Sequence, residues 1–340
     1  MEMIGLADLA DGAADMTVTA TSIPAAPLVV VDLQRDSWSH VEAAIAAVRR
    51  RRTVVVLGVS ETVLPSAAEP LLESLTCTLA PGGPGRAWVR SDRADLDRMA
   101  ATVAAAPRAA ITLAGLLELT SGASVRDGLL AESLAYSMLL AGPEFADWRV
   151  RTPRRPVPDT QDPVTLERTD DVLTISLNRP ERHNAFGRAV RDGLLDAFAV
   201  AEHDHTIREV VLRGTGRSFC SGGDLDEFGS ADDVSAAHLV RLSCSAGHAA
   251  YRLADRLRVV VHGACIGAGV ELPSFAGRVE ARDDAWFQLP ELSMGLVPGA
   301  GGTVSVCHRI GRWRTAFLAL TNRPIDVDTA LEWGLVDGRA

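Results

Sequence analysis

The stretch that most constrains the fold of this chain covers residues 259–303. It begins with three valines at 259–261, a β-branched run typical of a strand that is covered on both faces. Several glycines follow in HGACIGAG, and glycine adopts backbone conformations that other residues avoid. The stretch therefore predicts a buried strand, a sharp turn and a helix that begins near Ala268, as in an α/β fold.

Two glutamates in this stretch stand where acid/base chemistry is expected. Glu271 lies in the first turn of the predicted helix, and Glu291 follows twenty residues later, after the apolar segment AWFQLP. The first N–H groups of a helix lack backbone partners and favour nearby negative charge. Each glutamate alone could be structural, Glu271 beside the helix dipole and Glu291 as a surface cap. Together they predict a site that moves protons on a carbonyl compound.

The composition favours a globular protein without nucleic-acid or membrane partners. The chain has 340 residues, of which 47% are hydrophobic, and this suffices for a substantial core. A net charge of -10 argues against nucleic acid, and no segment approaches the roughly 18 uninterrupted apolar residues that span a bilayer. The start of the sequence lacks the features of a secretory signal. Five cysteines without CxxC spacing favour a reduced, cytoplasmic protein without a zinc site.

The first part of the chain predicts an accessory α/β region. Residues 1–26 lack periodicity and are expected to form a mobile tail. Residues 27–148 begin with a strand–helix–strand pattern, which predicts parallel strands. The predicted strands of this region are 28–33, 53–57 and 109–113, and the predicted helices are 41–48, 96–105 and 129–140.

A proline-rich segment divides the chain. Residues 149–163, RVRTPRRPVPDTQDP, combine prolines with mixed charge, which predicts a linker. A second domain is expected at residues 164–340, where strands and helices alternate again. Its first predicted elements are a strand at 172–177, a helix at 190–201, a strand at 210–212 and a long amphipathic helix at 239–257.

The repeated order suggests an internal duplication. VVVLGVSE from Val54 is similar to VVLRGTGR from Val210, and AAITLAG, which ends at Gly115, is similar to VVVHGAC around Gly263. Buried strands that end in glycine occur in many α/β proteins, so an unrelated accessory domain is the alternative. Residues 27–148 are therefore interpreted as an accessory α/β region or as a degenerate repeat of the later domain.

Five motifs in residues 164–340 occur in the order of a known family. LNRPERHNAF from Leu177 resembles a first CoA-binding segment, and LRGTGRSFCSGGDLDEF from Leu212 and HGACIGAGVEL from His262 resemble two oxyanion-hole loops. LPELSMGLVPGAGGT resembles a second catalytic segment, and LTNRPIDVDTALEWGLVD a closing helix pair. The family is the crotonase superfamily, the enoyl-CoA hydratases and isomerases. The resemblance implies a core of the crotonase type, a ββα spiral.

The resemblance also assigns roles to single residues. It implies that the backbone N–H groups of Gly223 and Ala268 hold the thioester oxygen, that Glu271 orients water and that Glu291 donates a proton. Neither a metal nor a redox cofactor is expected. Coenzyme A enters as part of the substrate. The resemblance further implies that six residues line the side that binds the CoA nucleotide: Arg182, His183, Asn184, Ala185, Asp224 and Leu225.

Reversible hydration of a 2-enoyl-CoA is the predicted reaction. Water addition needs one carboxylate as a base and a second carboxyl group as an acid, and the resemblance supplies both. An isomerase needs a single proton shuttle, so double-bond isomerisation is an alternative prediction. Thioester hydrolysis is another alternative on the same scaffold. A third reading is a non-catalytic subunit that binds acyl-CoA or a related crotonase.

The sequence departs from the family pattern in three places. Pro273 follows Glu271 closely, which a helix tolerates only in its first turn, and Gly277 stands where the family commonly has an acidic residue. The sequence given stops at Ala340, without the C-terminal helices that usually cover the acyl-CoA and build a trimer. We expect the N-terminal region or a partner chain to close the pocket, in a trimer-based homo-oligomer or in a complex with a related crotonase subunit.

Overall fold

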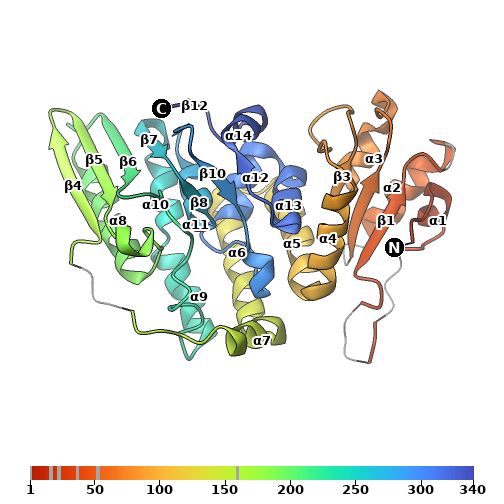
Figure 1. Ribbon diagram of the computed structural model, residues 1–340, viewed down its shortest axis with the longest axis horizontal. Helices are drawn as coiled ribbons and strands as arrows, with labels where there is room; N and C mark the ends of the chain where they lie inside the picture. Colours follow the sequence, from red (N-terminus) through yellow and green to blue (C-terminus); the bar gives the residue numbers. More distant parts are fainter. Residues whose placement is uncertain (1, 15–17, 21–23, 36–37, 51–53, 158–160) are drawn as a thin grey trace.

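The computed structural model of the chain has a sheet near each end and helices packed between them (Figure 1). The structure describes residues 2–14, 18–20, 24–35, 38–50, 54–157 and 161–340. Parallel strand pairs and intervening helices dominate both ends, so the predicted α/β class is confirmed. The helices between the sheets come from both halves of the sequence.

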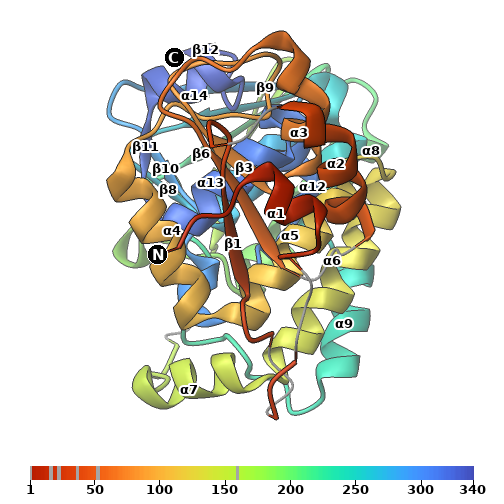
Figure 2. The ribbon, with the colours of Figure 1, turned by 90° about the vertical axis from the view of Figure 1, so that its right-hand side faces the viewer.

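The N-terminal sheet consists of the parallel strands β1 (Leu28–Asp32), β2 (Val55–Val59) and β3 (Cys77–Leu79), in that order. α2 (Val41–Arg50) follows a 3₁₀ turn (Trp38–His40) and connects β1 to β2, which confirms the predicted strand–helix–strand unit. The second strand was predicted at residues 53–57, of which residue 53 lies outside the described residues. The 3₁₀ turn Ser66–Ala68 and α3 (Glu69–Ser74) lead into β3, and Figure 2 shows α2 and α3 on the outer side of this sheet.

The start of the predicted tail, residues 2–14, folds onto the same sheet. α1 (Leu6–Ala10) buries Leu6 and Leu9, and the N–H of Ile4 donates to the carbonyl of Val30 at 3.0 Å. A mobile tail is therefore the wrong prediction for this segment, because two leucines about one turn apart give a short helix an apolar side. Residues 15–17 and 21–23 of the predicted tail lie outside the described residues.

Four consecutive helices follow the small sheet: α4 (Arg93–Ala105), α5 (Pro107–Thr120), α6 (Val125–Leu140) and α7 (Pro143–Arg151). The predicted helices at 96–105 and 129–140 are confirmed, but the predicted strand at 109–113 is wrong because it lies inside α5. Pro107 occupies the first turn, where its missing N–H costs nothing, and the alanines and leucines that follow favour a helix. The similarity of AAITLAG to the strand before Gly263 therefore has no structural counterpart.

No single helix in the described ranges has the length and apolar character needed to cross a membrane. The consecutive helices α4 and α5 pass that test only when they are taken together, and they are bent by 111° at the break between them. Both contribute buried residues to the hydrophobic core.

The larger sheet has six strands in the order β12-β9-β7-β6-β5-β4. β4 and β5 form an antiparallel hairpin, and the other neighbours are parallel. In a smaller sheet, β10 lies between β8 and β11. The strands are β4 (Val164–Thr169), β5 (Val172–Leu177), β6 (Glu209–Gly214), β7 (Leu257–Val261), β8 (Ala264–Ile266), β9 (Arg278–Ala281), β10 (Trp286–Gln288), β11 (Ile325–Asp326) and β12 (Gly338–Arg339).

α8 (Arg188–His203) confirms the predicted helix at 190–201, but the single long helix predicted at 239–257 is wrong. The structure has two helices, α9 (Val234–Ser243) and α10 (Ala246–Arg252), then a 3₁₀ turn (Ala254–Arg256) before β7. Ser245 has extended backbone angles and its hydroxyl accepts a hydrogen bond from the N–H of His248 at 3.1 Å, so it caps α10 and interrupts the helix.

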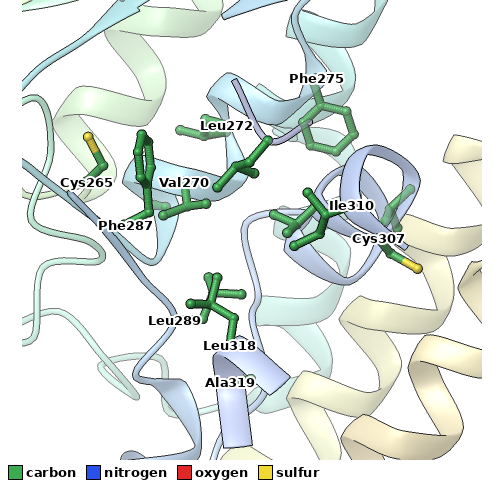
Figure 3. Packing of buried hydrophobic residues seen from close by; sticks show 14 of the residues in the cluster. Cys265, Val270, Leu272, Phe275, Phe287, Leu289, Cys307, Ile310, Leu318 and Ala319 are labelled. Atoms are coloured by element: carbon green, nitrogen blue, oxygen red, sulfur yellow. The ribbon is translucent and has the colours of Figure 1, made fainter. Parts of the chain in front are cut away.

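The remaining helices pack around α12 (Gly302–Ile310). Figure 3 shows Ile310 and Cys307 near Phe275, with Leu318 and Leu289 below them. α12 contacts α11 (Ala268–Glu271) and α13 (Arg312–Thr321), and also α5 and α6 from the first half of the chain. Helices α4–α7 therefore share one hydrophobic core with residues 164–340, and this core crosses the predicted linker. The last elements are α14 (Val327–Trp333) and the 3₁₀ turns Pro180–Arg182, Pro273–Phe275 and Glu291–Met294.

Candidate active site

A cavity of about 530 Å³ lies where α6 and α7 meet residues 164–340. Helices from the first half of the chain close it through Tyr136 and Leu140 of α6 and Phe145 of α7. Coverage by the N-terminal region is one of the two arrangements expected from the sequence. The cavity wall also contains all four residues with predicted catalytic roles, namely Gly223, Ala268, Glu271 and Glu291.

The start of α11 is shaped by glycines. Gly267 has φ 49° and ψ -116°, a conformation that glycine tolerates because it has no Cβ. A Cβ at Gly269 would lie 2.3 Å from the carbonyl oxygen of Cys220, so the helix can approach the backbone at Cys220 only with glycine there. Ala268 is the first residue of the helix, and its N–H has no intrahelical acceptor. The predicted helix start at Ala268 is confirmed.

Gly223 presents its backbone from a loop that pairs with Phe186. The N–H of Phe186 donates to the carbonyl of Gly222 at 2.8 Å, and the N–H of Asp224 donates to the carbonyl of Phe186 at 3.0 Å. In such a parallel bridge the residue between the two bonds directs its own N–H to the opposite side. Gly223 therefore turns its N–H away from Phe186, and it borders the same cavity as Ala268.

Glu271 is 2% exposed, and two backbone donors hold its carboxylate. Its Oε2 accepts hydrogen bonds from the N–H groups of Ala300 and Gly302, each at 2.8 Å. Burial raises the pKa of Glu271 from 4.5 to about 7, and the two N–H groups oppose this rise because they stabilise the charged form. Glu271 can therefore lose and regain a proton near neutral pH.

Glu291 is 6% exposed and lies in a different environment. Within the described residues its Oε2 has no hydrogen-bond partner, although the atom is buried beside the cavity. Burial, followed by the charge of Glu271, raises the pKa of Glu291 well above its usual value. The protonated form is thus favoured at Glu291, whereas the backbone donors around Glu271 favour the charged form.

A third buried carboxyl group, Glu132 of α6, was not predicted from the sequence. It is 2% exposed and accepts hydrogen bonds from the N–H of Gly301 at 2.7 Å, the N–H of Thr303 at 2.9 Å and the hydroxyl of Thr303 at 2.7 Å. Four successive N–H groups at the start of α12 thus alternate between Glu271 and Glu132. In the sequence, a single glutamate within a helical pattern carries no signal for this contact.

These carboxyl groups make the stability of the fold depend on pH. Burial, followed by the charge of Glu271, raises the pKa of Glu132 to about 8, and the pKa of Glu271 rises to about 7. An unfolded glutamate titrates near 4.5, so between about pH 5 and pH 8 the folded state binds more protons than the unfolded state. We expect the free energy of unfolding to fall as pH rises through this window, by up to about 1.4 kcal/mol per pH unit for each proton.

Urea unfolding at several pH values between 5 and 8 measures this slope. The Glu291→Gln variant, which cannot ionise at this position, is the control and should show a shallower slope. A free energy of unfolding that is constant or rises across the window would contradict the assignment of protonated buried carboxyl groups.

Of the six residues predicted to line the nucleotide side, the structure places Asp224 on the cavity wall. Asp224 is buried and accepts hydrogen bonds from Nη2 of Arg182 at 2.8 Å and Nη1 of Arg179 at 3.3 Å. Asn184 is fully buried, and its amide group donates to backbone carbonyls in the loop 215–219. Asn184 and Arg182 thus build the loop through internal bonds. His183, Ala185 and Leu225 also lie outside the residues that line the cavity.

Arginines at and after the end of α7 fix the rim of the cavity. Nη2 of Arg149 donates to the carbonyl of Leu225 at 2.8 Å, and the N–H of Arg155 donates to Oδ1 of Asp226 at 2.9 Å. Asp226 also accepts from Arg182 at 2.7 Å, and hydrogen bonding to Arg182 lowers its pKa to about 2. The segment that was predicted as a linker is therefore bonded to the loop that carries Gly223.

Comparison with known proteins gives consistent matches over the second half of the chain. The 2,3-dehydroadipyl-CoA hydratase of Escherichia coli (strain K12) is 32% identical over 173 residues, which cover 51% of this chain and 67% of that protein. The 1,2-epoxyphenylacetyl-CoA isomerase of the same strain is 34% identical over 170 residues, which cover 48% of this chain and 64% of that protein. The chain thus spans about two thirds of the length of these relatives.

A solved structure, the enoyl-CoA hydratase from Thermoplasma volcanium GSS1, has 32% sequence identity and a TM-score of 0.49. The alignment covers 53% of this chain and 72% of that chain. Residues 167–338, half of the chain, match the family described as enoyl-CoA hydratase/isomerase. The chain belongs to the enoyl-CoA hydratase/isomerase family, the crotonase family.

Proposed function

We propose that the protein catalyses the reversible addition of water to a 2-enoyl-CoA. The observation that carries this proposal is the pair Glu271 and Glu291, two buried carboxyl groups on one cavity whose surroundings differ. Backbone donors favour the charged form of Glu271, and burial without a partner favours the protonated form of Glu291. Two titratable groups that are held in different protonation states serve as the base and the acid of one reaction.

The proposed mechanism uses each group once in the hydration direction. Glu271 accepts a proton from water as the oxygen of that water bonds to the β-carbon of the substrate. Electron density moves to the thioester oxygen, where the N–H groups of Gly223 and Ala268 stabilise the enolate, each by about 3 to 4 kcal/mol. Glu291 then donates its proton to the α-carbon, which restores the thioester. Water is consumed, coenzyme A remains part of the product, and no further cofactor enters the proposed reaction.

Double-bond isomerisation is the second candidate because the relatives include isomerases as well as hydratases. An isomerase moves one proton between two carbons and needs a single shuttle, for which Glu291 with its unpaired oxygen would suffice. In that reaction Glu271 would not activate water. The two buried carboxyl groups favour hydration over this alternative.

We also propose that the protein forms a homo-oligomer, as in a trimer-based assembly. Apolar side chains are exposed on α6 at Leu130, Leu134 and Met138, which follow one another at helical spacing, and on α9 at Leu239. A second copy of the chain would remove these side chains from water. The alternative partner is a related crotonase subunit.

The proposed function predicts hydration of a conjugated thioester. With a panel of 2-enoyl-CoAs, we expect the absorbance of the conjugated thioester to fall after the protein is added, and to recover from the 3-hydroxyacyl-CoA in the reverse direction. The matched assay uses 3-enoyl-CoAs, whose isomerisation would raise the same absorbance. Turnover of 3-enoyl-CoAs alone would favour the isomerase, and the absence of turnover with either class would contradict the proposal.

A further inference from the structure

Arg241 of α9 brings a positive charge to the wall of the cavity. It is partly buried, and it borders both the main cavity and a smaller recess of about 70 Å³. Desolvation lowers the pKa of Arg241, which shows that its surroundings solvate the guanidinium less well than water does. A charged group in such a place is costly unless it is paired with an opposite charge.

The protein supplies neutral partners to this guanidinium. Nε of Arg241 donates to the hydroxyl of Ser133 at 3.1 Å, one terminal nitrogen donates to the hydroxyl of Ser137, and the ring of Tyr136 lies 5.0 Å from the guanidinium carbon. Across the described ranges, no carboxylate forms an ion pair with Arg241, and no group accepts a hydrogen bond from its Nη1. The guanidinium therefore retains both its charge and free donors for a ligand.

The other arginines on the cavity wall are either paired with a carboxylate or exposed to solvent. Arg191 is paired with Asp192, at 2.7 Å between Nη2 and Oδ1, and Arg188 is exposed to solvent. Glu132 raises the pKa of Arg241 electrostatically, but its oxygens already accept three hydrogen bonds from Gly301 and Thr303. Among the arginines of this wall, Arg241 is thus the one that is partly buried without a carboxylate partner.

The recess borders the segment whose N–H groups bind the buried glutamates. Its wall contains Ala300 and Gly301, whose N–H groups bind Glu271 and Glu132, and Glu132 itself also lines it. The recess shares five residues with the main cavity: Phe186, Arg191, Arg241, Gly299 and Ala300. A volume of about 70 Å³ corresponds to roughly two water molecules, since each occupies about 30 Å³ in the liquid. A carboxylate fits such a space, whereas a diphosphate with its nucleotide does not.

We propose that Arg241 binds a carboxylate at the far end of the acyl chain, so that the preferred substrates are CoA thioesters of dicarboxylic acids. The inference rests on the proposed function, because it assigns the acyl part of the same substrate. A guanidinium with free N–H groups binds a carboxylate through charge-assisted hydrogen bonds, and the neutral serines hold it in place. A phosphate of coenzyme A is the other anionic group that this chemistry could bind.

The test compares the CoA thioester of trans-2-hexenedioic acid with its terminal methyl ester. For the unaltered protein, kcat/KM should be at least about tenfold higher for the free acid. In Arg241→Gln, kcat/KM for the acid should fall about 10- to 100-fold, while kcat/KM for the ester changes less than about threefold. Arg188→Gln is the matched control, because Arg188 borders the main cavity but not the recess, and it should leave the acid-to-ester ratio unchanged.

Two results would overturn the inference. One is equal kcat/KM for the acid and the ester in the unaltered protein. The other is an equal loss for both thioesters in Arg241→Gln, which would assign the arginine to the phosphates of coenzyme A or to the fold. If neither thioester is hydrated, the proposed hydratase function fails, and the rise in Tm that each thioester produces then tests the carboxylate site separately.

Discussion

The Glu291→Gln variant is expected to lower kcat for hydration about 1,000-fold, because it removes the acid that protonates the α-carbon. An amide cannot donate a proton as a carboxylic acid does, and water does not readily replace it at a buried position. The side chain keeps its size and its neutral character, so KM should change little. Steady-state assays with a 2-enoyl-CoA at constant pH measure both quantities.

The same variant separates chemistry from folding. Burial already favours the protonated, uncharged form of Glu291, so an uncharged glutamine should not lower Tm, and above about pH 5, where the unfolded glutamate ionises, it should raise Tm. Glu280→Gln is a suitable control, because Glu280 lies on β9 outside the catalytic cavity and pairs with Arg258 and Arg278. It should retain kcat within about twofold. A Glu291→Gln variant with kcat within threefold of the unaltered protein would remove Glu291 from the mechanism.

The part of the candidate site around Glu271 and Glu291 could be located from the sequence because its signals are local. The turn at Gly267 and the helix start at Ala268 follow from glycine spacing, and the two glutamates lie on the same stretch. Burial and backbone pairing then bring Gly223 to the same cavity from a separate loop. Local backbone requirements of this kind leave a recognisable pattern in one chain.

The secondary structure of the first half of the chain was harder to predict, because its apolar residues form a run without a clear period. Residues 109–113 match a buried strand as well as a buried helix, and the packing of α5 against α12 and α13 decides between them. Glu132 was missed for a related reason. Its partners at Gly301 and Thr303 are far away in the sequence, and only the fold brings α6 against the start of α12.

On the predicted nucleotide side the motif was clear, but the sequence did not show which of its residues face a ligand. The loop around Arg182 and Asp224 has a strong motif, but the structure uses most of its polar groups to hold the loop itself. A motif records which residues a loop needs, and it does not separate residues that build the loop from residues that face a ligand. Burial separates them here, because Asn184 is fully enclosed and its amide is bonded to backbone carbonyls.

Replacing Glu132 with leucine is expected to lower the free energy of unfolding by about 3 to 5 kcal/mol, because three buried donors lose their acceptor together. These donors are the N–H of Gly301, the N–H of Thr303 and the hydroxyl of Thr303. Glutamine keeps one acceptor oxygen, so Glu132→Gln should lose about 2 kcal/mol, an intermediate amount. Urea unfolding at pH 6 measures both losses, and Glu332→Leu at an exposed site of α14 should change the free energy by less than about 0.5 kcal/mol.

The same series tests whether α6 positions the proposed base. Glu132 and Glu271 bind alternate N–H groups of one short segment, so a shift of this segment in Glu132→Gln would move Glu271 away from its water. A displacement of about 1 Å at a catalytic group can cost up to about 100-fold in rate, and we expect kcat to fall at least tenfold with little change in KM. Because Glu132 itself does not line the main cavity, a loss of stability with unchanged kcat would show that α6 covers the site without positioning Glu271.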